Sequence, residues 1–371
     1  MNKVLITGTG FYVPSDVISN AEIVESFNAY VALFNAEHAL AIENGTVEAL
    51  RESSSAFIVK ASGVENRHVI DKKHILDPLL MRPLLPERDN DALSLQAEMA
   101  VKSALKALHK AGKQASDVDM LVVSCSTLQR AYPGIAMEVQ AALGCGGYAF
   151  DMNVACSSAT FGMQTIVNAL KVGAAKVALL ISPEICSGHM SFCDRDSHFL
   201  FGDASSAMVL ETPETCQVDN PFEVVSIRLQ TQYSNNIRNN FGFLNWTCPA
   251  TAQARDKWFI QKGRTVFKEV IPMAAKMLSQ HLSDEGIVDV KRLWLHQANK
   301  NMNDLIAYKI LGHEASVAEA PLVLDRYGNT ASAGSIICFD HYHDDLATGD
   351  YGLLSSFGAG YSIGSVILKR C

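Results

Sequence analysis

The chain has 371 residues, enough for one large or two ordinary domains, and 48% hydrophobic with 19% charged residues is the composition of a compact globular protein. Its net charge of −8 argues against a nucleic-acid binder, because phosphate contacts need a concentrated excess of Lys and Arg. No apolar run reaches the roughly 18 residues that cross a bilayer, so we expect no membrane span.

The first strand and the cysteines indicate the compartment. The chain runs directly into a strand-like segment at 3–6, without a signal peptide. Its 9 cysteines are an odd number and include no C-x-x-C pair, which fits reduced thiols better than a disulfide framework or a zinc cage. We therefore expect a cytoplasmic protein without a metal.

Two short patterns are set aside. Gly8-Thr-Gly10 lacks the third glycine of a dinucleotide-binding loop and predicts a turn at a strand end. Near the other end of the chain, His341 and His343 lie in the polar end of a predicted helix, which favours a surface cap over a metal site.

Two long stretches of the first half have no counterpart in the second. Residues 21–51 carry apolar residues at helical spacing, such as Ile23 and Phe27, and predict one or two helices. Residues 71–91 combine three prolines with mixed charges and predict an irregular surface excursion. Loops of that length in a compact domain are usually functional or disordered.

Apart from these stretches, buried strands and helices alternate, and the two halves repeat one another. The helix expected at 97–112 and the strand at 117–125 correspond to those at 266–281 and 289–296. The halves also end alike, at 201–210 and 357–368. This pattern predicts an α/β fold of two duplicated halves, 1–212 and 213–371.

Cys156 is the first candidate for chemistry. It ends a small-residue turn directly before an amphipathic segment at 157–172, which places its sulfur beside unpaired N–H groups at a helix N-terminus. Such a position predicts a lowered pKa and a nucleophilic thiol. An inert buried thiol is the commoner state of any single cysteine, so the interpretation needs partners.

His296 and Asn329 supply those partners. His296 ends an apolar, strand-like run, and Asn329 lies in a turn built like the one that carries Cys156. Either residue alone is a weak signal, since His296 could be a core histidine and Asn329 a turn residue. Cysteine, histidine and asparagine at three strand ends together predict a nucleophilic site.

The motifs that carry these residues resemble those of the type III β-ketoacyl-acyl-carrier-protein synthases of the thiolase superfamily. DMNVACSSAT, WLHQAN, YGNTASAG and SSFGAGYSIGS occur in the order and spacing of that family. The resemblance covers nearly the whole chain apart from the two extra stretches. It implies a thiolase-like five-layer αβαβα fold, a homodimer, and an acyltransferase that needs no cofactor.

By the same resemblance, Cys156 is the acylated nucleophile, and His296 and Asn329 are its partners in decarboxylative condensation. Backbone N–H groups of Cys156, Ala359 and Gly360 would form the oxyanion hole. The expected substrates are an acyl-CoA and malonyl-carrier protein. An oxyanion held by preorganised N–H donors, each worth roughly 3 kcal/mol, supports this chemistry independently.

Substrate contacts follow from the resemblance with some departures. Arg195 matches an arginine that holds coenzyme A, whereas Phe57 stands at a tryptophan position. Tyr132 replaces a phenylalanine that bounds the acyl pocket. Phe201 and Phe357 complete the expected substrate contacts, and Phe357 matches a ring packed against the active-site cysteine.

The extra stretches and the segment 234–241 resemble a branch that uses medium-chain primers such as octanoyl-CoA to make β-ketodecanoyl-carrier protein. For the acidic carrier protein, Lys257, Arg264 and Lys268 are the candidate contacts, within a basic cluster that also contains Arg255 and Lys262. A solvated helix face explains that cluster about equally well.

Two other functions stay open. One is a ketosynthase of specialised metabolism that forms a ketone, a resorcinol precursor or an ester. The other is a catalytically silent subunit of a heterodimeric ketosynthase. Silent partners usually lack part of the Cys, His and Asn set, and this chain carries all three residues.

Overall fold

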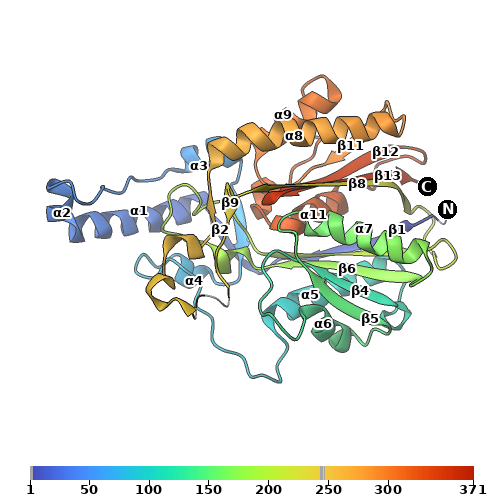
Figure 1. The fold of residues 1–371 in the computed structure, drawn as a ribbon, viewed down its shortest axis with the longest axis horizontal. Coiled ribbons are helices and arrows are strands. Elements are labelled where there is room, and N and C mark those ends of the chain that lie inside the picture. Colours follow the sequence, from blue (N-terminus) through green and yellow to red (C-terminus); the bar gives the residue numbers. More distant parts are fainter. Residues whose placement is uncertain (1–2, 243–244, 246) are drawn as a thin grey trace.

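The computed structural model describes residues 3–242, 245 and 247–371. The secondary structure is arranged in five layers, in which two layers of strands alternate with three layers of helices (Figure 1). Nine strands are hydrogen-bonded in the order β11-β12-β13-β8-β1-β7-β6-β4-β5. Among the described residues of this sheet, strands of the two halves pair only where Leu5 and Ile6 of β1 pair with Glu223 and Phe222 of β8, and beyond this joint the strands separate into two layers.

The first half builds the lower strand layer of Figure 1 and its outer helices. Its strands are β1 (Leu5–Tyr12), β7 (Ala204–Glu211), β6 (Val177–Glu184), β4 (Met120–Ser124) and β5 (Tyr148–Met152). The helices α5 (Leu95–Lys110) and α6 (Ile135–Leu143) cover its outer face. Apolar residues of α5, such as Ala100 and Ala104, pack there in one cluster with Leu121 and Val123 of β4.

The second half repeats this order. Its strands are β8 (Phe222–Ser234), β13 (Gly360–Arg370), β12 (Tyr351–Gly358) and β11 (Val290–Trp294), covered by α8 (Gly263–Asp284) and α9 (Lys300–Leu311). In each half the first three strands are antiparallel and the next joins in parallel. The predicted division near residue 213 falls between β7 and β8 and stays a prediction.

One strand of the repeat is missing among the described residues. In the first half β5 pairs in parallel with β4. At the equivalent position the segment 316–320 lies beside β11 through a bond from Leu293 N–H to the Glu319 carbonyl of 2.7 Å, without forming a strand. The outer edge of the second strand layer is therefore occupied by irregular chain.

The central layer holds α7 (Ser158–Lys171) and α11 (Gly334–His341) between the two strand layers (Figure 1). Met163 and Ile166 of α7 pack in one cluster with Leu180 of β6 and Leu354 of β12. Because both strand layers are covered on both faces, their strands are almost continuously apolar, as expected for buried sheets. The turn that contains Cys156 leads directly into α7 and thus into this core.

The glycine pair near the N-terminus differs from our prediction of a strand-end turn. Gly8 and Gly10 lie inside β1. A Cβ atom at Gly8 would come within 2.2 Å of the Ala107 carbonyl oxygen, so a side chain has no room between β1 and α5. Close packing of a helix on a strand accounts for these glycines.

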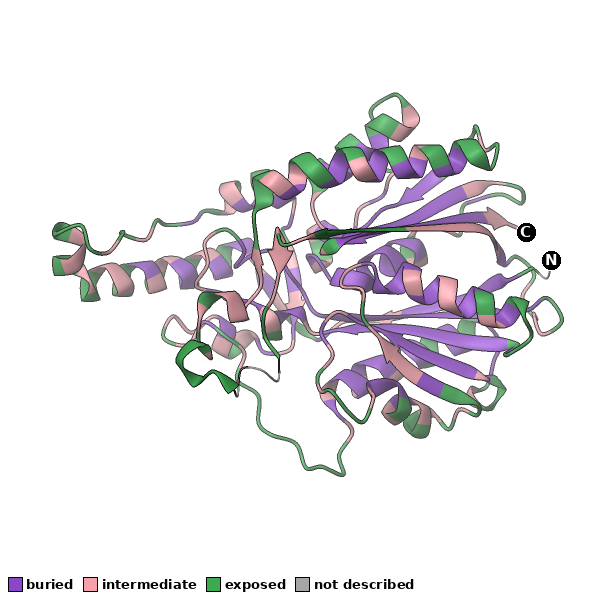
Figure 2. Cartoon of the chain, in the orientation of Figure 1, coloured by how far each residue is buried: buried purple, intermediate pink, exposed green. Residues whose placement is uncertain are grey.

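The predicted helical stretch 21–51 forms an arm that projects from the body (Figure 1). It consists of α1 (Asn20–Glu37), α2 (Ala39–Glu43) and a return chain. Ile23, Phe27 and Val31 of α1 are buried, whereas α2 has no buried residue (Figure 2). Asn28 and Asn35 of α1 each exchange two hydrogen bonds with the backbone of the return chain, at Ser53 and Leu50. These bonds tie the return chain to α1.

The remaining part of the chain forms short elements and irregular segments. The excursion 71–91 contains the short helix α4 (Lys72–Ile75) and continues as irregular, exposed chain. The other short elements are β2 (Asp16–Ser19), β3 (Asn66–Val69), α3 (Ser55–Ser62), β9 (Ile237–Arg238), β10 (Ile260–Gln261) and α10 (Leu324–Tyr327). No helix within the described ranges is long and apolar enough to cross a bilayer.

Candidate active site

A cavity of about 950 Å³ contains side chains from both halves. The predicted catalytic residues Cys156, His296 and Asn329 all line it, although they come from three distant segments. Phe201 and Phe357 line it as well. The duplicated fold therefore brings the predicted set together where the ends of the two strand layers meet.

Cys156 lies between β5 and α7 on a tightly fixed turn. Ala155, the residue before it, has a φ of 48°, a left-handed conformation that costs a residue with a side chain about 1 kcal/mol or more. The Ser158 hydroxyl holds this turn, since it accepts from Val154 N–H at 2.8 Å and donates to the Ala155 carbonyl at 2.6 Å. The sulfur is thereby held at the start of α7.

The protonation of Cys156 differs from our prediction. Burial raises the pKa of its thiol to about 12, and the negative charge of Glu184 adds to the increase. The residue's own N–H opposes the shift but does not reverse it. The expectation of a lowered pKa was wrong, because the loss of hydration around the sulfur and the negative charge of Glu184 outweigh the effect of the N–H group.

His296 is neutral in the cavity wall. Only 2% of the residue is exposed, and burial lowers the pKa of its ring to about 3. Its ring contacts the Phe357 ring edge-on, with 5.1 Å between centroids. Its Nδ1 has no hydrogen-bond partner within the described part of the chain. A neutral imidazole carries one N–H that can donate to a substrate oxygen.

The two polar neighbours of His296 in the WLHQAN motif have structural partners. The Gln297 side-chain oxygen accepts from Val323 N–H at 2.9 Å and from Leu324 N–H at 3.2 Å, which ties the end of β11 to the chain before Asn329. The Asn299 side chain caps α9 and donates to the Ala61 carbonyl at 2.7 Å. These contacts fix the chain directly after His296.

Asn329 is held by its backbone and by one side of its amide. Its N–H donates to the Leu200 carbonyl at 2.9 Å, and its carbonyl accepts from Gly202 N–H at 3.1 Å. Its side-chain Oδ1 accepts from Ala331 N–H at 2.9 Å. Because the oxygen is engaged, the Nδ2 group is the part of the amide left to serve the cavity.

The predicted oxyanion turn lies against the cysteine. A Cβ atom at Gly358 would come within 2.8 Å of the Cys156 Cβ, so only glycine allows this approach. Ala359 lines the cavity and does not adopt the left-handed conformation, which suits a residue with a side chain. Gly360 has a φ of 132° and is not among the lining residues.

Phe57 and Arg195 meet at the cavity mouth. The Arg195 guanidinium lies 4.1 Å from the centre of the Phe57 ring and donates to the Glu52 carbonyl at 2.8 Å. Phe57 lines the cavity, whereas Arg195 does not; its neighbour Asp196 does. A cation stacked on an aromatic ring is a suitable platform for a nucleobase. Deeper in the cavity, Phe201 packs edge-on against Phe259.

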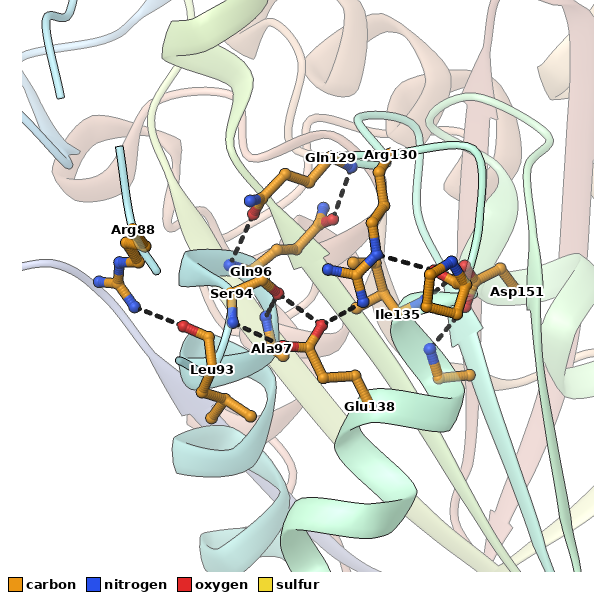
Figure 3. Close-up of polar contacts among 12 residues, drawn as sticks. Arg88, Leu93, Ser94, Gln96, Ala97, Gln129, Arg130, Ile135, Glu138 and Asp151 are labelled. Carbon is orange, nitrogen blue, oxygen red and sulfur yellow. Dashed lines mark hydrogen bonds and ion pairs between the residues drawn. The ribbon is translucent and has the colours of Figure 1, made fainter. Parts of the chain in front are cut away.

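Tyr132 does not line the cavity of its own chain, and its predicted place at the acyl pocket stays a prediction. It is 83% exposed. The residues shortly before it, Gln129 and Arg130, are held by hydrogen bonds (Figure 3). Gln129 and Gln96 bond reciprocally, each N–H donating to the other side chain, at 2.9 and 3.2 Å. Arg130 donates to the Pro133 carbonyl at 2.8 Å and to Glu138 at 2.6 Å. Within one chain, Tyr132 therefore faces outward from a rigid loop.

The basic candidates for the carrier protein divide into two groups. Arg264 and Lys268, at the start of α8, line the cavity mouth. Lys257 does not line it and forms a long ion pair with Asp256, with a closest distance of 3.9 Å. Arg255 is paired with Asp194. The two α8 residues are the better placed of these candidates.

Sequence reasoning missed Glu184. This carboxylate, at the end of β6, is fully buried and accepts hydrogen bonds from both halves of the molecule. The available signal was an acidic residue at the end of the apolar run Val177–Ile181, where burial requires hydrogen-bond partners. Among the described residues, no cluster of three or more His, Cys, Asp or Glu side chains could hold a metal ion.

Comparisons with known proteins agree with this geometry. Family models described as 3-oxoacyl-[acyl-carrier-protein] synthase III and as its C-terminal part match residues 150–231 and 283–370. The β-ketodecanoyl-[acyl-carrier-protein] synthase of Pseudomonas aeruginosa is 56% identical over 349 residues, which are 94% of this chain and all of that protein. A β-ketoacyl-[acyl-carrier-protein] synthase III of Chelativorans sp. is 29% identical over 88% of this chain and 94% of that protein.

Solved structures confirm the predicted thiolase-like fold. The 3-oxoacyl-[acyl-carrier-protein] synthase III of Aquifex aeolicus superimposes with a TM-score of 0.76 at 22% identity, over 99% of both chains. A synthase III from Pseudomonas aeruginosa gives 0.76 at 23% identity, over 99% of this chain and 98% of that one. These likenesses concern the fold.

Proposed function

The chain belongs to the 3-oxoacyl-[acyl-carrier-protein] synthase III family, and we propose that it condenses an acyl-CoA primer with malonyl-carrier protein, with loss of carbon dioxide. One observation carries the proposal: a single cavity is lined by a thiol, a neutral imidazole and an amide that keeps its N–H₂ group available. These are the groups that acyl transfer and enolate formation need.

In the first step the Cys156 sulfur attacks the thioester carbonyl of the primer. N–H groups at Cys156 and Ala359 would hold the tetrahedral oxyanion. When the intermediate collapses, the acyl group stays on sulfur and the thiol proton leaves with coenzyme A. Because the thiol pKa is about 12, the sulfur carries its proton at neutral pH and must lose it as it attacks.

In the second step malonyl-carrier protein loses carbon dioxide, and negative charge develops on its thioester oxygen. That step needs hydrogen-bond donors rather than a base, and neutral His296 and Asn329 Nδ2 are suitable donors. The enolate carbon attacks the acyl-Cys156 carbonyl, forms the C–C bond and expels the sulfur. One proton is taken up to restore the thiol.

We assign a medium-chain primer, with octanoyl-CoA as the best candidate. A β-ketodecanoyl product has ten carbons, of which a malonyl donor supplies two, so the similar synthase of Pseudomonas aeruginosa requires an eight-carbon primer. The cavity of this chain offers apolar walls for such a chain, from Phe199, Phe201, Phe259 and Met302.

Mass spectrometry of intact protein mixed with acetyl-, butyryl-, octanoyl- and dodecanoyl-CoA tests both statements. We expect an octanoyl adduct on Cys156 that forms faster than the others, and none in Cys156→Ala. A Cys156→Ala protein that still acylates would remove the nucleophile assignment. An adduct with acetyl-CoA alone would contradict the primer assignment, and no adduct with any primer would favour a silent subunit.

The carrier protein is assigned to the exposed face of α8. Arg264, Lys268 and Lys276 are spaced by four and eight residues, which places them on one side of the helix. All three are exposed, and the ion pairs among the described residues include none of them. Positive charge beside a cavity mouth steers an acidic partner.

We also propose a cytoplasmic homodimer that pairs through β5. β5 has a hydrogen-bonded neighbour on one side only, β4. Exposed Tyr148 of β5, Met137 and Tyr132 supply apolar area at this edge, and Tyr132 would then face the partner's cavity. Light scattering should give about twice 40.3 kDa, and Tyr148→Asp should shift the mass toward one chain. A wild-type mass of 40.3 kDa would contradict the proposed dimer.

A further inference from the structure

Glu184 is a buried carboxylate without a cationic partner. It is fully buried, and no ion pair among the described residues includes it. All its hydrogen-bond donors are neutral. On the side of the first half they are Ser126 N–H at 2.9 Å, the Ser126 hydroxyl at 2.7 Å, the Thr127 hydroxyl at 2.9 Å and the Cys125 thiol at 3.4 Å. An ionised carboxylate inside a protein is costly unless such donors surround it.

The remaining donors come from the second half. Ser332 donates to Glu184 through its N–H at 3.3 Å and through its hydroxyl in a short hydrogen bond. Ser332 follows Ala331, whose φ is 48°. Ala331 N–H is the group that engages the Asn329 Oδ1. A strained turn persists only where its surroundings hold it, and Glu184 is the buried group that anchors this one.

We propose that Glu184 is a positioning residue for the condensation step, which keeps the Asn329 amide aimed into the cavity by anchoring the 329–332 turn through Ser332. This inference rests on the proposed function of Asn329. It explains why a carboxylate stays next to the nucleophile although its charge opposes thiolate formation. Acyl transfer does not need Asn329, so loss of the anchor should separate the two steps.

Ser332→Ala is the first test, because it removes the hydroxyl contacts to Glu184 and to the Ser124 carbonyl (3.1 Å) and leaves the Glu184 charge in place. We expect acylation of Cys156 by octanoyl-CoA to stay within about twofold of the wild type, while condensation with malonyl-carrier protein falls on the order of 10- to 100-fold. Ser182→Ala is the matched control. Ser182 is also fully buried, and its hydroxyl bonds to Ser124 at 2.9 Å rather than to Glu184, so both rates should stay unchanged.

Glu184→Gln is the second test, and it adds a readout at the thiol. The neutral amide keeps the size of the side chain but loses an acceptor, so condensation should again fall more than acylation. Iodoacetamide should also modify Cys156 faster in Glu184→Gln than in the wild type, whereas Ser332→Ala should leave this rate unchanged. That difference separates the charge of Glu184 from its anchoring contact.

The outcomes keep this inference apart from the proposed function. If the wild-type protein acylates Cys156 but never condenses, the proposed condensation itself is wrong, and with it the function of Asn329. If the wild type condenses and both variants keep its ratio of condensation to acylation, the positioning role is wrong. Equal losses of both steps in Ser332→Ala would also overturn it, because they would indicate general damage to the cavity.

Discussion

At the scale of single residues, the site depends on two groups that burial keeps uncharged. The pKa of Cys156 rises to about 12 and that of His296 falls to about 3, so at pH 7 the thiol keeps its proton and the imidazole carries no charge. In this state His296 is a donor and not a base. The arrangement favours enolate stabilisation over permanent activation of sulfur.

Replacement of His296 by alanine tests this division of labour. We expect acyl transfer to Cys156 to continue, while decarboxylation of malonyl-carrier protein falls on the order of 100- to 1000-fold because one oxyanion donor is lost. Acylation is followed by mass spectrometry and decarboxylation by release of labelled carbon dioxide. Equal losses in both steps would mean that His296 also serves the thiol.

The thiol pKa gives a second prediction at this scale. Because Cys156 titrates near pH 12, its alkylation by iodoacetamide should increase about tenfold per pH unit between pH 7 and 9, without a plateau. Peptide mapping separates it from the exposed Cys248, which is the internal control. A plateau below pH 8 would show that the thiolate forms readily and that the pKa of Cys156 is lowered, as its sequence position predicted.

The sequence predicted the identity of the cavity residues better than their state. Motif spacing indicated Cys156, His296 and Asn329, and the structure places all three in one cavity. The direction of the Cys156 shift depends on burial and on Glu184, which is 28 positions away and invisible to a local pattern. The outward position of Tyr132 within one chain was invisible for a related reason, since loop direction is a tertiary property.

At the scale of elements, α8 combines a cavity wall with a charged outer face. The helix begins three residues before the predicted start at 266 and extends to Asp284, with Val266 and Val270 buried. Its exposed basic residues therefore have a fixed relation to the cavity mouth. One helix therefore carries both the basic residues and part of the wall of the cavity that holds Cys156.

Reversal of the α8 charges tests the carrier surface. Arg264→Glu combined with Lys268→Glu should raise the KM for malonyl-carrier protein about tenfold, because attraction becomes repulsion, while acylation by octanoyl-CoA continues. Lys171→Glu, at the exposed end of α7, is the matched control and should change neither. An unchanged KM in the double variant would return these residues to ordinary surface.

Element boundaries were predictable where burial is regular and not where the cavity interrupts it. Within the segment 201–210, in which the halves end alike, β7 begins only at Ala204, because Phe201 instead bridges to Asn329 in the cavity wall. The strand expected at 289–296 ends at Trp294, before the residues that deliver His296. In both cases a tertiary contact at the site shortens the element.

At the scale of the whole molecule, buried neutral histidines link stability to pH. Burial lowers the pKa of His198 and His281 to about 4 and that of His296 to about 3. Below pH 6.5 the unfolded chain binds protons at these rings and the folded chain does not, so acid favours unfolding. Asp203 opposes this, because its folded pKa of about 6 lets the native state bind a proton first.

We therefore expect the Tm to fall as pH drops from about 6.5 to 4, since three histidines outweigh one aspartate. His198, 1% exposed, should alone account for about 3 kcal/mol of the loss at the lower end. Scanning fluorimetry between pH 8 and 4 measures the change, and above pH 6.5 these groups should leave the Tm flat. A constant Tm down to pH 4 would show that the rings are protonated in the native state.

The irregular segment at 316–320 has a consequence for assembly. A fold duplicated in full would expose two similar strand edges, and an edge of one copy meeting the other edge of the next would build an open-ended filament. Here the second edge carries one bond to β11 through Glu319 and offers no strand to extend. Within the described part of the nine-stranded sheet, β5 is then the edge left for strand pairing, and a contact between two like edges closes after two copies.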